Sequence, residues 1–345
     1  MRVVVTGVAG LIGSWWAQAL VEAGDEVRSI DNLSGGDLAS IPCGVPLSNI
    51  DCGDREGVLA FLKDFRPEVV VHCAALPYEG LSVFSPSLVF NNVAGASVSL
   101  FSAAIAAGVR KIVFCSSMAR YGRQPMAYGP DRNGRGVHGF NEAQPTRPCD
   151  PYGIAKVAAE DVLKALGEAH GIEWSVVVPH NVYGPRQRYW DPYRNVVGIF
   201  LNGMLQGAAP PIFSDGAQTR CFTYVEDLLP LFVPLTRKTY SVLNVGPDDG
   251  TVTINALWRL CAEVTGFWGE PRYLPARPLE VPDASCLAAK ARALFGWEPK
   301  TSLREGVEKY AAWIRERGPR PFERHLTVEL PWAPAHWLQE EKGDG

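Results

Sequence analysis

The chain has 345 residues, of which 47% are hydrophobic and 20% are charged. This composition is typical of a globular protein, and the length allows one large α/β domain or two closely joined domains. The formal net charge of −4 gives no electrostatic reason to expect nucleic acid or an anionic membrane surface as a partner. No apolar run approaches the roughly 18 residues of a membrane span, and the N-terminus enters an apolar strand directly, without a signal peptide. We therefore expect no membrane association.

The cysteines and histidines give no sign of a disulfide framework or a metal site. The eight cysteines lie singly, and several lie within apolar runs, which is typical of reduced core thiols in a cytoplasmic protein. The six histidines show no metal-ligand spacing. His72, inside a predicted buried strand, is expected to be a core histidine with satisfied hydrogen bonds. We therefore expect a cytoplasmic protein without a bound metal.

A glycine-rich turn follows the first predicted strand, residues 3–5. Gly7, Gly10 and Gly13 form a GxxGxxG pattern between this strand and a predicted helix over 14–23. The first glycine permits a tight turn, the second lets backbone approach a pyrophosphate, and the third lets the helix pack closely on the strand. The free N–H groups at the helix start then face the phosphates. The pattern predicts a dinucleotide site, although a glycine-rich turn without nucleotide would show the same spacing.

Two aspartates follow the next two predicted strands. Asp31 ends the strand over 26–30 and lies 24 residues after the first glycine of the turn. An aspartate at this place accepts hydrogen bonds from both ribose hydroxyls and repels a 2′-phosphate, which favours NAD over NADP. Asp51 follows a short run at 46–50 and is placed to meet the adenine amino group, with Cys52 beside it. Either aspartate could instead cap only its own loop.

Apolar runs and amphipathic helices then alternate along the chain. Strands are predicted over 68–75, 110–117, 172–178 and 242–245, and a long helix is predicted over 86–107. This alternation predicts an α/β protein with a Rossmann-type doubly wound parallel sheet of about seven strands, followed by a smaller mixed α/β C-terminal domain.

Tyr152 and Lys156 lie four residues apart at the start of a predicted helix, so both side chains point to one face. A phenol normally loses its proton near pH ~10, and an ammonium group one turn away should lower that pKa. Ser117 follows a predicted buried strand, so its hydroxyl should lie at the carboxyl end of that strand. Together the three would move a proton on and off a substrate hydroxyl. Alone, the spacing also fits a surface tyrosine and lysine.

These motifs together resemble the extended short-chain dehydrogenase/reductases, and within them the nucleotide-sugar epimerases and dehydratases, such as the UDP-glucose 4-epimerases. The resemblance rests on Thr6-Gly7-x-x-Gly10-x-x-Gly13, Asp31, Asn92, Ser116-Ser117 and Tyr152-x-x-x-Lys156, and it covers residues 1 to about 318. It implies NAD as the cofactor, Tyr152 as the base, Ser117 sharing its hydrogen bond, and Lys156 on the nicotinamide ribose. The cofactor-binding residues that it implies are Gly7, Gly10, Leu11, Ile12, Gly13, Asp31, Asn32, Asp51, Cys52, Ala74, Ala75, Asn92, Ser116, Tyr152, Lys156 and Pro179.

The resemblance also implies the residues that bind a nucleotide-sugar substrate. They are Ser117, Asn181, Asn195, Arg220, Arg277 and Glu280. The two arginines would hold the diphosphate, which suits guanidinium geometry, and Glu280 would bind the nucleoside ribose. Two positions depart from the family pattern. Val178 replaces a common arginine, and Leu279 replaces the usual glycine, which weakens the assignment of Glu280.

The resemblance implies hydride transfer at C4 of the sugar, and two positions indicate the fate of the resulting keto sugar. Related dehydratases place Asp-Glu directly after the catalytic serine or threonine. At the second of these positions related decarboxylases place a carboxylate, and 3,5-epimerases a cysteine. Here the positions hold Met118 and Ala119, which carry no acid or base. We therefore predict an NAD-dependent 4-epimerase that acts through a transient 4-keto intermediate, with a UDP-hexose as the expected substrate.

Two alternatives stay open. One is another nucleotide-sugar-modifying enzyme of the same family (a dehydratase, another epimerase or a reductase) that finds a second base elsewhere, for instance at His180 or within 122–151. The other is a non-catalytic NAD-binding regulator that kept the fold.

The predicted domains follow from the same pattern. The NAD-binding domain covers residues 1–178, with 219–250 returning to it. The substrate domain comprises 179–218 and 251–318, and a tail covers 319–345.

Three further segments are expected at surfaces. The long loop 122–151 is either a lid at the mouth of the site or a surface excursion. The tail should pack on the body or on a partner subunit. Family members pair through two helices that correspond to 86–107 and 152–169, so a homodimer is expected.

Overall fold

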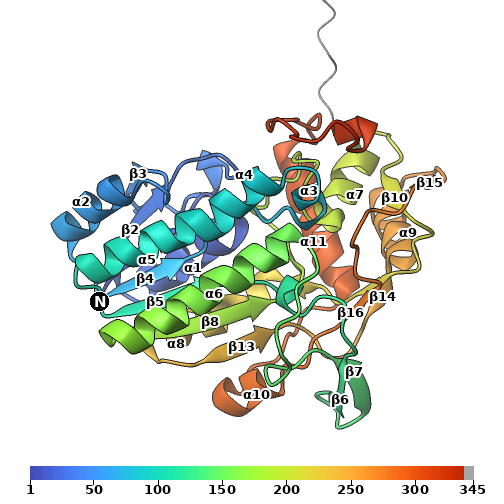
Figure 1. Ribbon diagram of the computed structural model, residues 1–345. Coiled ribbons are helices and arrows are strands. Elements are labelled where there is room, and N and C mark those ends of the chain that lie inside the picture. The colour runs from blue at the N-terminus through green and yellow to red at the C-terminus, as the bar shows by residue number, and fades with distance from the viewer. Residues whose placement is uncertain (338–345) are drawn as a thin grey trace, which may run out of the picture.

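The computed structural model describes residues 1–337, and its centre is a parallel sheet of seven strands (Figure 1). All neighbouring strands pair in parallel, in the order β13-β8-β5-β4-β1-β2-β3. The strands are β1 (Arg2–Thr6), β2 (Glu26–Asp31), β3 (Leu47–Asn49), β4 (Val69–His72), β5 (Lys111–Cys115), β8 (Glu173–Pro179) and β13 (Val242–Val245). This arrangement confirms the predicted doubly wound parallel sheet.

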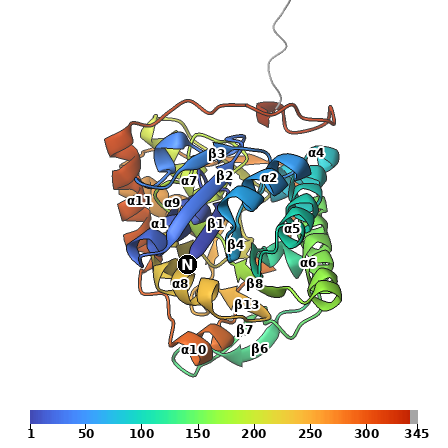
Figure 2. The ribbon, with the colours of Figure 1, turned by 90° about the vertical axis from the view of Figure 1, so that its left-hand side faces the viewer.

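Both faces of the sheet are buried because the central strands are apolar along their length. In β1, Val3 and Val5 belong to one core, and Val4 belongs to the core on the opposite face. Two helices cover the first face and three cover the second (Figures 1 and 2). They are α1 (Leu11–Glu22) and α8 (Leu229–Arg237) on one side, and α2 (Arg55–Phe65), α5 (Ala96–Ala106) and α6 (Pro151–His170) on the other.

The helix predicted over 86–107 consists of three consecutive segments. α4 (Pro86–Phe90) leads into a π-helical turn, η2 (Asn91–Gly95), and then into α5. The turn contains Asn92, and such π-turns are frequent at functional sites. By length and composition alone Pro86–Ala106 could cross a membrane, so the expectation that no apolar run approaches that length is wrong. Half of its apolar window is buried inside the protein, as in many core helices. It is therefore no argument for a membrane.

The second part of the molecule packs three helices around an aromatic core. These helices are α7 (Val196–Leu205), α9 (Ile254–Thr265) and α11 (Leu303–Arg317), and Ser302 caps α11 by accepting from the Glu305 N–H. The short strands pair as β9 (Val182–Tyr183) with β12 (Thr223–Tyr224), β10 (Pro211–Phe213) with β15 (Arg272–Leu274), and β11 (Thr219–Arg220) with β14 (Val252–Thr253) and β16 (Asp283–Ala284). The remaining helices are η1 (Leu38–Ser40), α3 (Glu79–Ser82), η3 (Met118–Arg120), η4 (Val225–Leu228), α10 (Ala289–Phe295) and η5 (Ala335–Trp337).

The long segment 122–151 contains a β-hairpin of β6 (Ala127–Pro130) and β7 (Gly136–Gly139). Its turn is held by the Asp131 carboxylate, which accepts from the N–H groups of Asn133 and Arg135 at 2.8 Å each. The Arg132 N–H donates to Asp248, which ties the hairpin to the loop after β13. In Figures 1 and 2 the hairpin projects from one end of the molecule, and the C-terminal segment crosses the opposite end.

Residues 319–337 pack on the body and cross it from the end of α11 to α4 (Figure 2). The Leu330 N–H donates to the Phe84 carbonyl at 2.9 Å. The Glu329 carboxylate accepts from two N–H groups at the start of α4, those of Ser87 and Leu88. A carboxylate there is favourable, because a helix N-terminus carries partial positive charge. Residues 338–345 of the predicted tail lie outside the described residues.

Candidate active site

The carboxyl ends of the sheet strands open into a cavity of about 580 Å³. The loops that follow β1, β2, β4, β5 and β8 line it on one side, and α7, β10 and residues 277–280 line it on the other. In doubly wound sheets ligands bind outside the carboxyl ends of the strands, where the strand order reverses. Here the order reverses between β1 and β4. The cavity therefore lies where this fold binds its ligands.

The turn from β1 to α1 forms one end of the cavity. Gly7 has a φ of +71°, and a Cβ added at Gly13 would lie 2.2 Å from the Gly7 carbonyl oxygen, so both positions require glycine. Gly10 is the N-cap of α1 and provides no side-chain cap for the helix. The first residues of α1, Leu11 and Ile12, line the cavity. Uncapped N–H groups at a helix start form an anion site of the kind that holds a pyrophosphate.

Asp31 stands at the end of β2, beside this turn. One carboxylate oxygen accepts from the Ala9 N–H at 2.9 Å, and the other accepts from the Leu33 N–H at 2.8 Å. Burial raises the pKa of the Asp31 carboxyl above its ordinary value, and these two hydrogen bonds oppose the rise. Each oxygen has a further acceptor site, so the carboxylate retains capacity for ribose hydroxyls.

The other residues predicted at the cofactor also line this end of the cavity. The Asn32 amide donates to the Asp51 carboxylate at 2.7 Å, which orders the loops after β2 and β3 against each other. The predicted lining residues found here are Asn32, Asp51, Cys52, Ala74, Ala75, Asn92, Ser116 and Pro179. An uncapped helix start, an acidic residue at the end of β2 and small residues after β4 fit a dinucleotide with a pyrophosphate and an unphosphorylated ribose. The residues present therefore fit NAD.

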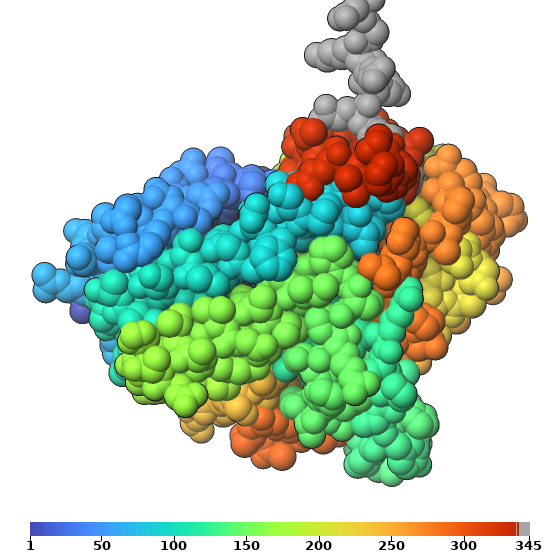
Figure 3. Space-filling model, viewed as in Figure 1, coloured from blue at the N-terminus to red at the C-terminus, as the bar shows by residue number. Residues whose placement is uncertain are grey.

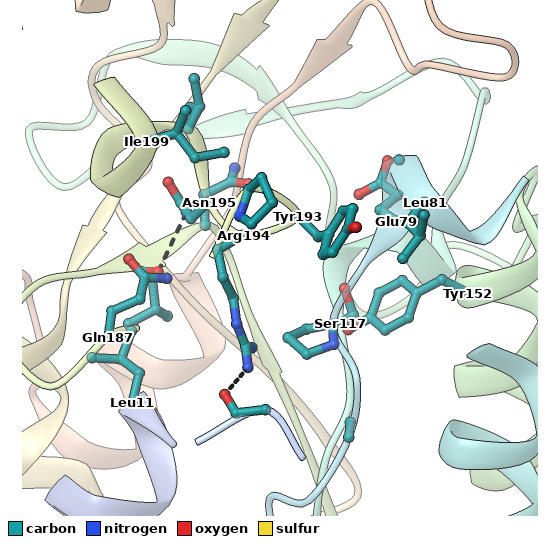
Figure 4. Close-up of a pocket in the computed structure, with 18 of the residues that line it drawn as sticks. Leu11, Glu79, Leu81, Ser117, Tyr152, Gln187, Tyr193, Arg194, Asn195 and Ile199 are labelled. Carbon is teal, nitrogen blue, oxygen red and sulfur yellow. Dashed lines mark hydrogen bonds between the residues drawn. The ribbon is translucent and has the colours of Figure 1, made fainter. Parts of the chain in front are cut away.

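Ser117, Tyr152 and Lys156 meet where β5 ends and α6 begins. Asp150 caps α6 by accepting from the Gly153 N–H at 2.9 Å, and this places Tyr152 in the first turn of the helix. The Lys156 Nζ donates to the Cys115 carbonyl at 2.8 Å and lies 5.9 Å from the centre of the Tyr152 ring. The Ser117 hydroxyl lies close enough to Tyr152 to lower the pKa of its phenol, and Figure 4 shows the two side chains pointing to the same part of the cavity. The three predicted catalytic side chains are thus together.

The protonation of this group differs from the prediction. Burial raises the pKa of the Tyr152 phenol above its ordinary value, and the hydrogen bond with Ser117 lowers it by a smaller amount. Burial also lowers the pKa of the Lys156 ammonium. Both shifts have the same cause, because removal from water disfavours the charged form of each group. The prediction that Lys156 brings the Tyr152 pKa below its ordinary value is therefore wrong for this structure.

The predicted substrate residues line the far end of the cavity. The Asn181 amide donates to the Cys221 carbonyl at 2.8 Å, and Asn195 caps α7 by accepting from the Val197 N–H at 3.0 Å. Arg220 donates to three backbone carbonyls, those of Thr219, Val281 and Pro282. Both asparagines and the arginine are therefore held in place by backbone contacts.

Glu280 lies between the two predicted diphosphate arginines. Its carboxylate is 2.7 Å from the Arg277 guanidinium and 3.7 Å from that of Arg220. Leu279 has a φ of +60°, so the turn keeps the backbone conformation that favours glycine although leucine occupies it. The roles predicted for these residues stay predictions, but the substitution at 279 has not displaced Glu280 from the arginines.

Residues 3–246 match the family model described as NAD dependent epimerase/dehydratase family. The chain belongs to this family. The match confirms the predicted family and the NAD cofactor.

Relatives match this family member over nearly their whole length. The UDP-glucose 4-epimerase of Mycolicibacterium smegmatis is 33% identical over 330 residues, which cover 92% of this chain and 99% of that protein. The structure of a UDP-glucose 4-epimerase from Thermotoga maritima with UDP-glucose is 32% identical, has a TM-score of 0.83, and is matched over 92% of this chain and 99% of its own. The UDP-glucose 4-epimerase of Thermus thermophilus in complex with NAD is 32% identical, with a TM-score of 0.82 and coverage of 91% and 99%. This chain therefore contains residues without a counterpart in these relatives.

Several cavity residues were not found from the sequence. Arg194 is held by Asp191 at 3.1 Å and by the Gly35 carbonyl, with its guanidinium 5.0 Å from the centre of the Tyr78 ring (Figure 4). Arg194 directly precedes the predicted Asn195, but its loop has no periodic pattern from which a site residue could have been predicted. The others come from α3, from the loop before α7 and from the C-terminal segment: Glu79, Gly80, Leu81, Gln187, Tyr193, Phe322, Arg324 and Trp337.

The C-terminal segment forms part of the cavity wall. Trp337 is buried, and its ring centre lies 5.8 Å from those of both Tyr193 and Phe213. The Arg277 guanidinium lies 4.7 Å from the centre of the Phe213 ring, on the same wall. In Figure 3 the segment, drawn in red, covers this end of the molecule. A tail expected only to pack on the body also shapes the site.

Several sequence candidates lie outside the cavity. No residue of 119–149 is among its described lining residues, so the hairpin is not a lid in this structure. His180 is buried away from the lining, and burial lowers its pKa to about 3. His72 is the predicted core histidine, hydrogen-bonded to Thr6 at 2.7 Å and Ser97 at 2.9 Å. Within residues 1–337 no group of three or more His, Cys, Asp or Glu side chains is placed to hold a metal ion.

Two alanine substitutions in the glycine turn should have different consequences. In Gly13→Ala the new methyl meets Gly7 backbone atoms at 2.2 and 2.7 Å, and we expect a loss of unfolding free energy on the order of 3 kcal/mol. In Gly10→Ala the nearest atom is 3.2 Å away, so the loss should stay within about 1 kcal/mol, while the methyl weakens NAD binding about tenfold by standing at the phosphate site. Urea unfolding and NAD titration measure the two effects. Equal loss of stability in both variants would contradict this account of the turn.

Asp150 should make the stability of the protein depend on pH. Burial and the charge of Glu79 raise the pKa of its carboxyl to about 7. Between about pH 4 and 7 the folded protein therefore binds a proton that the unfolded chain has lost, so stability falls as pH rises through this window. Asp150→Asn keeps the helix cap and removes the titration. The unfolding free energy of the variant minus that of the parent should increase by a few kcal/mol from pH 5 to pH 8. A constant difference in urea unfolding at both pH values would exclude a buried, titrating Asp150.

Proposed function

We propose that this protein is an NAD-dependent nucleotide-sugar 4-epimerase that acts on a UDP-hexose through a transient 4-keto intermediate. The observation that carries the proposal is the meeting of Ser117, Tyr152 and Lys156 in one cavity, between the dinucleotide site and a pair of arginines. The two positions after Ser117 carry no acid or base, which favours simple removal and return of hydride over elimination. UDP-glucose 4-epimerases at about one third identity over nearly the whole chain support UDP as the nucleotide.

The side chains divide the proton chemistry among them. Tyr152 takes the proton of the 4-hydroxyl while the C4 hydrogen leaves as hydride, and it returns a proton when the hydroxyl is restored. Ser117 points to the same part of the cavity as Tyr152 and can bond the same substrate oxygen, which would hold that oxygen against the phenol. Lys156, held by the Cys115 carbonyl, places its amino group next to the phenol, where its protonated form would stabilise the phenolate. When bound, NAD supplies the acceptor and then the donor of the hydride.

Inversion at C4 requires the keto sugar to present its other face. Arg220 and Arg277 would hold the diphosphate while the sugar turns, because neither guanidinium needs to move far from its present partners. The cavity volume of about 580 Å³ lies in the usual range for small-molecule sites, which leaves room for this motion. In this proposal the diphosphate stays bound to the two arginines while the sugar ring rotates.

Another sugar-nucleotide-modifying activity remains the second candidate for one reason. Glu79 and Asp150 are carboxylates that line the cavity near Tyr152, and a dehydratase or a different epimerase needs such a second acid or base. His180, the candidate for that base from the sequence, does not line the cavity. The identity of the product separates these activities.

We also propose that the protein is a cytoplasmic homodimer. α5 and α6 lie side by side on one face of the molecule, and a second copy would complete a four-helix contact (Figure 1). Phe90 and Ile154 on this face are 40% and 45% exposed, which is high for large apolar side chains. All eight cysteines are free thiols, as is usual in a reducing compartment.

Incubation of the protein and NAD with UDP-glucose should yield UDP-galactose as the only new sugar nucleotide, identified by NMR. Tyr152→Phe removes the proton acceptor without changing the ring, so turnover should fall by about 10²–10⁴-fold while NAD binding stays close to that of the parent. A stable keto, deoxy or decarboxylated product would overturn the epimerase proposal. Absence of turnover by the parent on UDP-, dTDP- and GDP-hexoses would instead favour a non-catalytic NAD-binding protein.

Ile154→Glu should convert the dimer to a monomer, because it places a charge in the apolar centre of the proposed contact. Leu294→Glu is the matched control, since Leu294 is 48% exposed on α10, away from this face. Light scattering coupled to size exclusion measures the mass of each. If the parent is a monomer, or if both variants keep the dimer mass, the contact is not where we place it.

A further inference from the structure

The short helix α3 carries a carboxylate into the part of the cavity where the sugar reacts. Glu79 is the first residue of α3 and lines the cavity, and Figure 4 shows it beside Tyr152 and Tyr193. Its charge acts on both Tyr152 and Asp150, raising the pKa of each, which places it close to the catalytic tyrosine. Nothing in the proposed reaction uses this side chain.

The next residue fixes the direction in which the substrate must lie. A Cβ added at Gly80 would be 2.6 Å from Nη1 of Arg277 and 3.3 Å from the Trp337 ring. Consecutive residues of α3 therefore face the two ends of the site: Glu79 faces Tyr152, and Gly80 faces the arginine proposed for the diphosphate. A hexose held with C4 at Tyr152 and its diphosphate at Arg277 must pass along Glu79.

The Glu79 carboxylate has no protein partner within residues 1–337. Its backbone carbonyl accepts from Ser82, but its side chain takes part in no hydrogen bond or ion pair there. The arginines nearest to the sugar path are committed elsewhere, Arg277 to Glu280 and Arg194 to Asp191. One oxygen of the neighbouring Asp150 is also buried and unpaired, although it lines the same cavity. Glu79 is therefore an acceptor without a protein donor, in the described part of the chain, at the space that the sugar would occupy.

We propose that Glu79 is a specificity-determining residue, whose carboxylate accepts hydrogen bonds from hydroxyls of a neutral sugar and whose charge excludes sugars that carry a carboxylate. The inference rests on the proposed function and names its substrate class: neutral hexoses are accepted, and hexuronates are rejected. An unpaired acceptor in a cavity selects for hydroxyl donors, because a ligand without them leaves it unsatisfied. A second carboxylate in the same low-dielectric space is repelled.

Glu79→Gln tests the assignment, since it keeps the shape and one acceptor oxygen and removes the charge. Dissociation constants for UDP-glucose and UDP-glucuronate are measured by calorimetry on the full chain with NAD. We expect the parent to bind UDP-glucose at least about tenfold more tightly than UDP-glucuronate, and this preference to fall by about tenfold or more in the variant. The reduced preference should come mainly from tighter binding of UDP-glucuronate, and the affinity for UDP-glucose should fall by less than about tenfold. Glu79 makes no side-chain bond within residues 1–337, and removal of its charge relieves repulsion of the Asp150 carboxylate, so the variant should unfold at or above the temperature of the parent.

Glu298→Gln is the matched control, because Glu298 is exposed and does not line the cavity. It should leave the preference unchanged. A parent that binds both sugar nucleotides equally, or a Glu79→Gln variant that keeps the preference of the parent, would overturn the assignment. Failure of the proposed function would give a different result. UDP-glucose would bind without being epimerised, and Glu79→Gln would still abolish the preference for UDP-glucose. That result would contradict the epimerase proposal and leave the proposed role of Glu79 intact.

Discussion

The contact between the end of β5 and the first turns of α6 positions the three side chains that we propose as catalytic, Ser117, Tyr152 and Lys156. Lys156 reaches back to the Cys115 carbonyl, and one turn further Glu160 accepts from Ser116 at 2.5 Å and pairs with Arg120 at 3.2 Å. Arg120 and Glu160 are almost fully buried, so their pairing gains little net stability, but loss of either would leave an uncompensated charge in the interior. We infer that the Arg120–Glu160 pair serves to fix the position of α6 relative to the end of β5. It holds the segment after β5 against α6, and so holds Ser117 against Tyr152.

Burial of these side chains also disfavours their charged forms. Tyr152 and Lys156 are shifted toward their neutral forms, and His72 beneath them is kept neutral. A desolvated phenol is a poor base until positive charge enters the cavity, so Lys156 alone does not account for its reactivity.

The fold and the cofactor end were predictable because their signals are local. The glycine turn and Asp31 each directly follow a strand, and Tyr152 and Lys156 lie in the first two turns of one helix, so backbone geometry within a short segment places each signal. The strand predicted over 242–245 was found with the same limits, and three of its four residues are the apolar side chains that a buried strand favours. The pKa of Tyr152 was not predictable, because it depends on how much water the folded site excludes, and spacing along a helix contains no information on that.

The substrate end was harder to predict because distant segments build it. Glu79 follows β4, Arg194 lies in a loop without periodicity, and Trp337 belongs to a segment that was expected only to pack. Their proximity is a product of tertiary structure: Glu329 and Leu330 pin the C-terminal segment to α4 and Phe84, and this brings Trp337 against Phe213 and Gly80. The relatives are matched over 99% of their own length but leave part of this chain unmatched. The proposed catalytic residues thus lie near the carboxyl ends of the sheet strands. The shape of the sugar site depends on segments whose position no local sequence motif predicts.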